Sequence, residues 1–193
     1  MTATLATTLA TALWPASDRN LARSALIAIA GSALLWVSAK IQVPFWPVPL
    51  TMQTFVVLSL GAALGWRLGT ATVALYLLEG ALGLPVFAGT PEKGLGIAYM
   101  AGPTGGYLAG FIAGGLAVGL LAERGWDRSV PRMFAAVALG HALIFLAGWA
   151  WLATLVGPAK AWVLGVEPFY AATLLKTALA AFLLPAVWRL VRK

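Results

Sequence analysis

Cysteine is absent from this chain, histidine occurs once, and charged side chains are scarce. Without cysteine the chain forms no disulfides, and cysteine content therefore does not indicate whether its compartment is oxidising or reducing. Charged residues make up only 10% of the 193 residues, against roughly a quarter in a soluble domain, so a soluble domain is excluded. The sequence also has no glycine-rich phosphate-binding loop and no usable arrangement of serine, histidine and aspartate. We therefore expect no enzyme activity, no cofactor and no ATP binding by the chain itself.

Apolar sequence is abundant instead, because 61% of the residues are hydrophobic. A bilayer core is crossed by about 20 consecutive apolar residues, and runs close to that length recur along the chain. The predicted spans are Leu21–Ala39, Leu50–Trp66, Leu68–Val86, Gly105–Ala122, Met133–Val156 and Phe169–Trp188. Since only Arg67 separates the second from the third, these two should form a tight helical hairpin. The sequence predicts an all-α integral membrane protein with six transmembrane helices in one compact bundle (21–193), after a short lead-in (1–20).

The basic residues predict the orientation of this bundle. Alternate connections place nine cations on one side, namely Arg19, Arg23, Arg67, Arg124, Arg128, Arg132, Arg189, Arg192 and Lys193. The other side has only Lys40, Lys93 and Lys160. The positive-inside rule then places both termini in the cytoplasm of a multi-pass protein of the cytoplasmic (inner) membrane. The net charge of +7 thus reflects topology, and the scattered cations give no reason to expect nucleic acid as a partner.

A segment between the third and fourth spans, 84–111, cannot be a continuous helix. It contains Pro85, Pro91 and Pro103, and six glycines lie within residues 87–106. Irregular backbone at membrane depth survives only when buried in protein or lining a watery cavity. Polar side chains accompany it at Glu92, Lys93, Tyr99, Thr104 and Tyr107. The segment is therefore either part of a small-molecule pocket or an ordinary loop outside the membrane.

Among the ionisable residues inside predicted spans, two stand out, Glu79 in the third span and Lys176 in the sixth. Such groups are costly in a bilayer and indicate function by default. Three interpretations stay open: a salt bridge between them, snorkelling of Lys176 to the interface, or contact of both with a ligand. His141, in the fifth span, has no acidic or cysteine neighbour on its own helix, so we expect a buried, hydrogen-bonded histidine rather than a metal site.

The first loop, 40–53, is stiffened by three prolines and ends at Gln53. Its Trp46 is either an interfacial anchor or a flat cover for a pocket. Within the first span, Ser24, Ala28 and Ser32 recur at a spacing that lets another helix approach closely. That stripe serves either packing inside the bundle or docking of a separate membrane subunit.

Three motifs in order resemble one family. They are QVPFWPVPLTMQ at 42–53, GLPVFAG at 83–89 and GPTGGYLAGF at 102–111. Together they resemble the BioY family, the biotin-specific substrate-binding (S) subunits of energy-coupling-factor (ECF) vitamin transporters. The resemblance runs from about Ala39 to Lys176 and leaves the first 20 residues outside.

The resemblance implies a vitamin held near the outer face under the first loop and the 84–104 segment. Lys93 matches a basic residue, often arginine, that pairs with the biotin carboxylate. Lys176 matches the lysine of an Asp-x-x-Lys pattern that meets the ureido ring, but Thr173 stands where the aspartate is expected. We hypothesise that Glu79, in the third span, supplies the missing carboxylate. The expected site combines these residues with a further polar group and an apolar wall, and comprises Trp46, Gln53, Glu79, Phe87, Lys93, Tyr107, Thr173 and Lys176.

Family membership also implies partners. Biotin would be the transported ligand, membrane lipid the surroundings, and two ATPase subunits would supply energy through a transmembrane coupling subunit docked on the first span. Whether the chain transports biotin without that coupling module stays open, and so does whether it forms a homo-oligomer. The alternatives are a stand-alone proton-driven transporter, with Glu79 or His141 titrating, and an integral-membrane enzyme acting on lipid.

Overall fold

The computed structural model describes residues 8–13, 21–43 and 46–191. In this part of the chain, the helices are joined by loops, one of which holds a small antiparallel strand pair. The elements are α1 (Leu9–Leu13), α2 (Leu21–Lys40), β1 (Gln42–Val43), β2 (Leu50–Thr51), α3 (Gln53–Ala81), α4 (Gly96–Met100), α5 (Gly105–Glu123), η1 (Trp126–Arg128), α6 (Val130–Val156), α7 (Pro158–Gly165), η2 (Glu167–Phe169) and α8 (Tyr170–Val191).

The all-α membrane character predicted from composition is confirmed. In the described residues, five helical stretches are long and apolar enough to cross a membrane: α2, α3, α5, α6 and the stretch Pro158–Val191. Four of the expected spans agree with single helices within a few residues. The short helix α7 was not anticipated; Gly157, with φ of 84°, separates it from α6.

The second and third predicted spans form the single long helix α3, which is sharply kinked at Gly65. Gly65 has φ of 79° and ψ of 173°, a conformation that only glycine adopts readily. The two arms, 53–64 and 66–81, fold back on each other, since a Cβ at Gly69 would lie 3.0 Å from the Cα of Gly61. The expected hairpin is therefore present, with its turn at Gly65 instead of Arg67. Each arm is shorter than the about 20 residues of a standard span, so six crossings stay a prediction.

The ends of these two spans differ from the prediction. Leu50 and Thr51 are not helical, because they pair with Val43 and Gln42 as strand β2. At the other end, the segment after Ala81 leaves the helix because Gly83 takes a φ of 95°. The apolar runs continue through both places, so hydrophobicity alone could not mark these boundaries.

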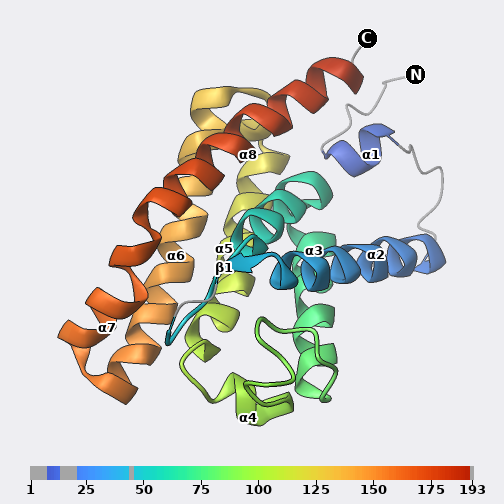
Figure 1. The fold of residues 1–193 in the computed structure, drawn as a ribbon. Coiled ribbons are helices and arrows are strands. Elements are labelled where there is room, and N and C mark those ends of the chain that lie inside the picture. Colours follow the sequence, from blue (N-terminus) through green and yellow to red (C-terminus); the bar gives the residue numbers. More distant parts are fainter. Residues whose placement is uncertain (1–7, 14–20, 44–45, 192–193) are drawn as a thin grey trace, which may run out of the picture.

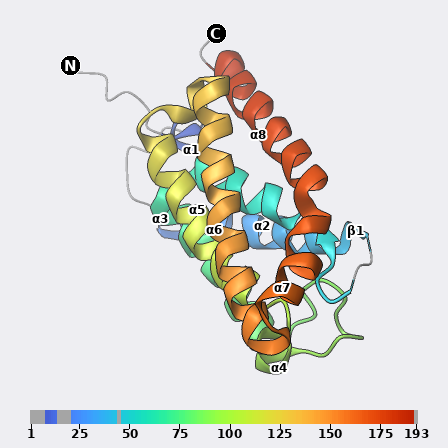
Figure 2. The same cartoon turned by 90° about the vertical axis from the view of Figure 1, so that its left-hand side faces the viewer.

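The core is built where α3, α5 and α6 approach closely through glycines. A Cβ at Gly61 would lie 2.5 Å from the carbonyl oxygen of Gly115, and one at Gly114 would lie 2.8 Å from that of Gly140. Close approach of this kind is the usual way in which helices gain packing contacts in membranes. Figure 2 shows α5 and α6 side by side, with α8 beside α6.

The two ends of the molecule differ in charge. Figure 1 places α1, the turn of α3, η1 and the last turns of α8 at one end, and α4 and α7 at the other. The elements of the first end include Arg67 after the turn of α3, Arg124 and Arg128 before and in η1, Arg132 at the start of α6 and Arg189 at the end of α8. At the second end, Lys160 lies in α7 and Lys93 precedes α4. At the arginine-rich end Glu123 accepts a hydrogen bond from the backbone N–H of Trp66 at 3.2 Å, which caps the second arm of α3.

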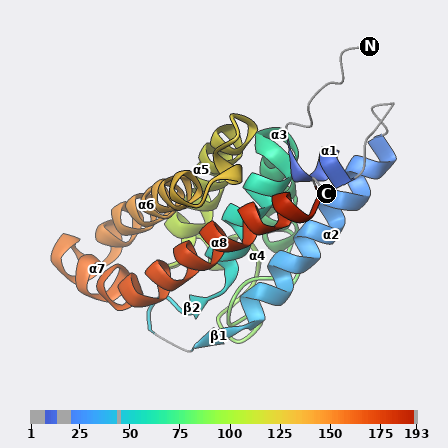
Figure 3. The ribbon, with the colours of Figure 1, turned by 90° about the horizontal axis from the view of Figure 1, so that it is seen from above.

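Helix α2 runs across the other helices and packs mainly on α3 (Figures 1 and 3). Ser32 faces inward and donates a hydrogen bond to the carboxylate of Glu79. At the end of α2, the Lys40 amine donates to the carbonyl oxygens of Phe87 at 3.1 Å and Thr90 at 2.9 Å. This lysine therefore ties α2 to the irregular segment before α4.

The lead-in is described only in part. Helix α1 packs against α3 and α8, and Leu9 is buried there. The predicted boundary at residue 20 lies outside the described residues.

Candidate functional site

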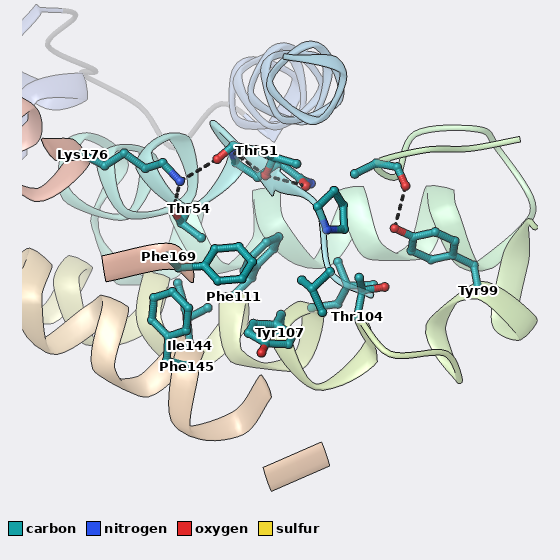
Figure 4. A pocket seen from close by; sticks show the side chains of 15 residues that line it. Thr51, Thr54, Tyr99, Thr104, Tyr107, Phe111, Ile144, Phe145, Phe169 and Lys176 are labelled. Atoms are coloured by element: carbon teal, nitrogen blue, oxygen red, sulfur yellow. Dashed lines mark hydrogen bonds between the residues drawn. The ribbon is translucent and has the colours of Figure 1, made fainter. Parts of the chain in front are cut away.

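A cavity lies between the first loop, α3, α5, α6 and the start of α8 (Figure 4). It holds about 540 Å³ of space free of protein atoms, counting the part open to the outside. Its wall is mostly apolar with a few polar groups, as expected for a small-molecule site. The lining residues are Val48, Pro49, Thr51, Gln53, Thr54, Ala88, Tyr99, Thr104, Tyr107, Leu108, Phe111, Ile144, Phe145, Phe169 and Lys176.

Lys176 supplies the cation of this cavity. Its side chain is only 7% exposed, and its amine donates to the carbonyl oxygen of Thr51 at 2.6 Å and the hydroxyl of Thr54 at 3.4 Å. It therefore does not snorkel to the surface. An ammonium has three N–H donors, so the third has no partner among the described residues and can serve a ligand.

Gln53 joins the first loop to both arms of α3. It is 4% exposed, accepts a hydrogen bond from the hydroxyl of Thr51 at 3.2 Å, and donates to the hydroxyl of Tyr76 at 2.7 Å. Tyr76 in turn donates to the carbonyl oxygen of Val86 at 2.8 Å. Because both ends of its amide are engaged inside the protein, Gln53 holds the wall of the cavity in place.

Tyr107 lies in a slot made by two glycines. A Cβ at Gly148 would collide with its ring and one at Gly165 with its hydroxyl. The hydroxyl donates to the carbonyl oxygen of Gly165 at 2.7 Å, and the ring meets Phe145 edge-on. Tyr107 therefore presents a fixed aromatic surface to the cavity.

Phe87 stands behind the wall instead of in it. It is 1% exposed and packs between the rings of Tyr76 and Tyr99, whose centroids lie 5.4 Å and 5.0 Å away. Tyr99 itself lines the cavity and donates to the carbonyl oxygen of Ala88 at 2.8 Å. Burial raises the pKa of Tyr99, so its hydroxyl stays a neutral donor.

Lys93 is exposed and lies at the rim. It lines a small neighbouring hollow together with Pro47, Ala98 and Gly102. Tyr99 and Thr104 line both spaces. Lys93 therefore lies at the outer edge of the cavity, and its pairing with a ligand carboxylate stays a prediction.

Besides Phe87 and Lys93, three more predicted site residues lie outside the cavity lining. Trp46 is 73% exposed on the first loop, as an interfacial anchor would be. The carboxylate of Glu79 accepts from Ser32 on α2, whereas the amine of Lys176 binds Thr51 and Thr54, so the salt bridge between them is not formed. The carbonyl oxygen of Thr173 accepts from Thr177 at 2.8 Å.

The proposed docking stripe of the first span is divided. Ser24 is exposed and Ala28 is half-buried, but Ser32 is buried against α3 and Glu79. Ser32 therefore belongs to the packing of the bundle rather than to a free face.

His141 is a buried, hydrogen-bonded residue, as expected. It is 2% exposed, with Nε2 at 3.2 Å from the hydroxyl of Thr54 and Nδ1 at 3.0 Å from that of Thr177. In the described part of the chain, no group of three or more acidic, histidine or cysteine residues could hold a metal ion.

Sequence reasoning missed several lining residues. Thr51 lies in the first motif and Thr54 directly follows it, and Tyr99 and Thr104 stood out as polar groups in the irregular segment. The apolar lining residues Phe111, Ile144, Phe145 and Phe169 could not be distinguished from lipid-facing ones, because each lies in an apolar run.

Comparison with known proteins gives consistent results. The model of the BioY family matches residues 4–193. A probable biotin transporter BioY of Pyrococcus horikoshii is 42% identical over 78% of this chain and 87% of its own. The biotin transporter BioY of Thermotoga maritima is 42% identical over 79% of this chain and 88% of its own. The biotin transporter BioY of Rhizobium etli is 37% identical over 89% of this chain and 94% of its own.

A solved structure has the same fold. It is the crystal structure at 2.1 Å of the S-component for biotin from an ECF-type ABC transporter, with a TM-score of 0.76 and 21% identity. The alignment covers 90% of this chain and 95% of that one. The family match includes most of the lead-in, which the motifs alone had left outside. With nearly the whole chain matched and relatives this similar, the chain belongs to the BioY family.

Proposed function

We propose that this chain binds biotin with high affinity in the cavity and takes part in its uptake across the cytoplasmic membrane as the substrate-binding subunit of an ECF-type transporter. The observation that carries the proposal is a cavity with one buried cation, Lys176, and an otherwise largely apolar wall. Two relatives that are 42% identical to this chain are named a probable biotin transporter and a biotin transporter.

The chemistry of biotin fits these groups. Its thiophane ring and aliphatic chain suit the aromatic wall around Tyr107 and Phe169, and its ureido carbonyl can accept from the third N–H of Lys176. Its carboxylate can extend to the rim and pair with Lys93. Such fixed polar partners give selectivity, because an analogue without the matching group leaves them unpaired.

The finer topology supports the same role. If each arm of α3 counts as a span, the chain crosses the membrane six times and both termini are cytoplasmic. The arginine-rich end of Figure 1 then faces the cytoplasm, and the cavity opens toward the outside. A coupling subunit and two ATPases would supply the energy, with the exposed face of α2 available for docking.

Equilibrium binding of biotin to the purified chain in detergent tests the binding step. We expect tight binding that weakens about 10- to 100-fold in Lys176→Met, since this change removes charge-assisted hydrogen bonds but keeps the length of the side chain. Lys160→Met, on exposed α7, is the matched control and should bind as the parent does. Absence of binding by the parent would contradict the proposal, and unchanged binding by Lys176→Met would move the site elsewhere.

Uptake of labelled biotin by cells tests the energy source. We expect uptake that depends on the coupling and ATPase subunits and survives collapse of the proton gradient while ATP is maintained. Uptake by the chain alone that stops with the gradient would favour a proton-driven transporter instead.

A further inference from the structure

A continuous set of hydrogen bonds starts at two residues of the cavity lining, Thr54 and Lys176, and joins three helices. His141 of α6 lies between Thr54 of α3, at 3.2 Å from Nε2, and Thr177 of α8, at 3.0 Å from Nδ1. Thr177 continues to the carbonyl oxygen of Thr173 at 2.8 Å. At the other end of the set, the hydroxyl of Thr54 accepts a hydrogen bond from the amine of Lys176 at 3.4 Å.

The order of donors along this set follows from proton counting. The hydroxyl of Thr177 has one proton, and it is donated to Thr173, the usual bond of a helical threonine to the carbonyl four residues back. Thr177 must then accept from His141, which places the imidazole proton on Nδ1. In a neutral imidazole Nε2 is therefore an acceptor, and only the hydroxyl of Thr54 can supply its proton.

This order fixes what Thr54 offers to the cavity. With its proton committed to His141, the oxygen of Thr54 presents lone pairs alone. One of them accepts from Lys176, and Thr54 is itself a residue of the cavity lining (Figure 4). A donor on Lys176 and an acceptor on Thr54 thus lie side by side. A cyclic urea is complementary to this pair, because its C=O can accept from Lys176 and its N–H can donate to Thr54.

We propose that Thr54 is a specificity-determining residue that accepts a ring N–H of the ligand, and that His141 is the positioning residue that keeps Thr54 an acceptor. The inference rests on the proposed function for the identity of the ligand. It also explains how the site works although Thr173 provides no carboxylate for the same N–H. The hydroxyl of Thr173 is not needed, because its backbone carbonyl anchors the far end of the set.

Binding measurements with the purified full chain test the acceptor. Two N-methyl derivatives of biotin, one for each ureido nitrogen, each lack one donor. We expect the parent to reject at least one derivative about 10- to 100-fold, the cost of leaving a buried polar group unpaired. Thr54→Val should lose about that much affinity for biotin and with it the discrimination, whereas Thr54→Ser should keep both.

The positioning role predicts which substitution of His141 is tolerated. His141→Gln can place an amide oxygen near the former Nε2 and still accept from Thr54, so it should retain more discrimination than His141→Leu. Thr72→Val is the matched control, since Thr72 is a buried threonine of the same helix whose hydroxyl bonds only to Leu68. It should bind biotin and both derivatives as the parent does.

The ¹⁵N spectrum of the imidazole tests the proton order without any ligand. His141 is the only histidine, so a chain labelled in histidine and purified without a histidine tag gives one residue's signals. We expect a neutral ring protonated at Nδ1, and a shifted Nε2 resonance in Thr54→Val but not in Thr72→Val. A ring protonated at Nε2, or discrimination unchanged in Thr54→Val, would overturn the inference. If the parent binds no biotin, the proposed function fails while this spectrum still tests Thr54 as an acceptor.

Discussion

At the residue scale, Lys176 both binds the first loop and lines the cavity. Its amine holds the carbonyl oxygen of Thr51 at 2.6 Å and thereby fixes the end of the first loop against α8. The same amine keeps one N–H for the cavity. A variant of Lys176 would therefore lose its loop contact together with the proposed ligand contact, so variants of Thr54 and Lys93 separate the two effects better.

Lys93 should contribute a modest, charge-specific part of the affinity. Because the residue is exposed, Lys93→Ala should weaken biotin binding only about 2- to 5-fold, the effect of a surface ion pair. The weakening should disappear at high salt, where surface charges are screened. Binding of biotin amide, which has no carboxylate, should not change. Titration of both ligands at two salt concentrations measures this.

Lys160→Ala is the control for this change, because Lys160 is an exposed lysine at the same end of the molecule. An equal loss for biotin and its amide would contradict an ion pair with Lys93.

At the scale of elements, the hairpin of α3 depends on one glycine. Gly65→Ala should destabilise the protein by about 1–3 kcal/mol from backbone strain alone, and its Cβ would also collide with the carboxylate of Glu123. We expect a clear fall in the thermal unfolding temperature in detergent.

The variant Gly83→Ala separates the cost of backbone strain from the cost of the collision with Glu123. Gly83 also has positive φ, at 95°, but a Cβ there would meet nothing within 4 Å. Its unfolding temperature should fall less than that of Gly65→Ala. Equal falls would show that the close packing beside Glu123 has no cost.

The irregular segment depends on α2. Lys40→Met removes the bonds to Phe87 and Thr90, so amide exchange over residues 87–94 should quicken. Exchange in α5 should not change, because α5 receives none of these bonds. Hydrogen exchange followed by mass spectrometry measures both regions. Unchanged exchange over 87–94 would mean that other contacts hold this segment.

At the scale of the whole molecule, the separation of charge between the two ends predicts the orientation. Because the chain has no cysteine, single-cysteine variants provide unique labels. Glu92→Cys should react with a membrane-impermeant maleimide added outside intact cells. Arg124→Cys, at the arginine-rich end, should react only after the membrane is opened. The reverse pattern would invert the topology and place the cavity on the cytoplasmic side.

The sequence by itself determined the class of the molecule and the family. Its apolar runs are a direct consequence of the bilayer as solvent, and its three motifs indicated BioY before any geometry. It also indicated Gln53, Tyr107 and Lys176, which line the cavity, and Lys93 at its rim.

Only the tertiary structure decided the partners of these residues. Glu79 lies within the bundle because α2 brings Ser32 to it, and Phe87 stands behind Tyr99 because the irregular segment folds over α3. Thr54 and His141 come from helices far apart in the chain, and nothing in either local sequence marks their contact. The physical reason is that hydrophobicity determines which segments enter the membrane, whereas close approach at glycines and the pairing of buried polar groups determine which side chains meet there.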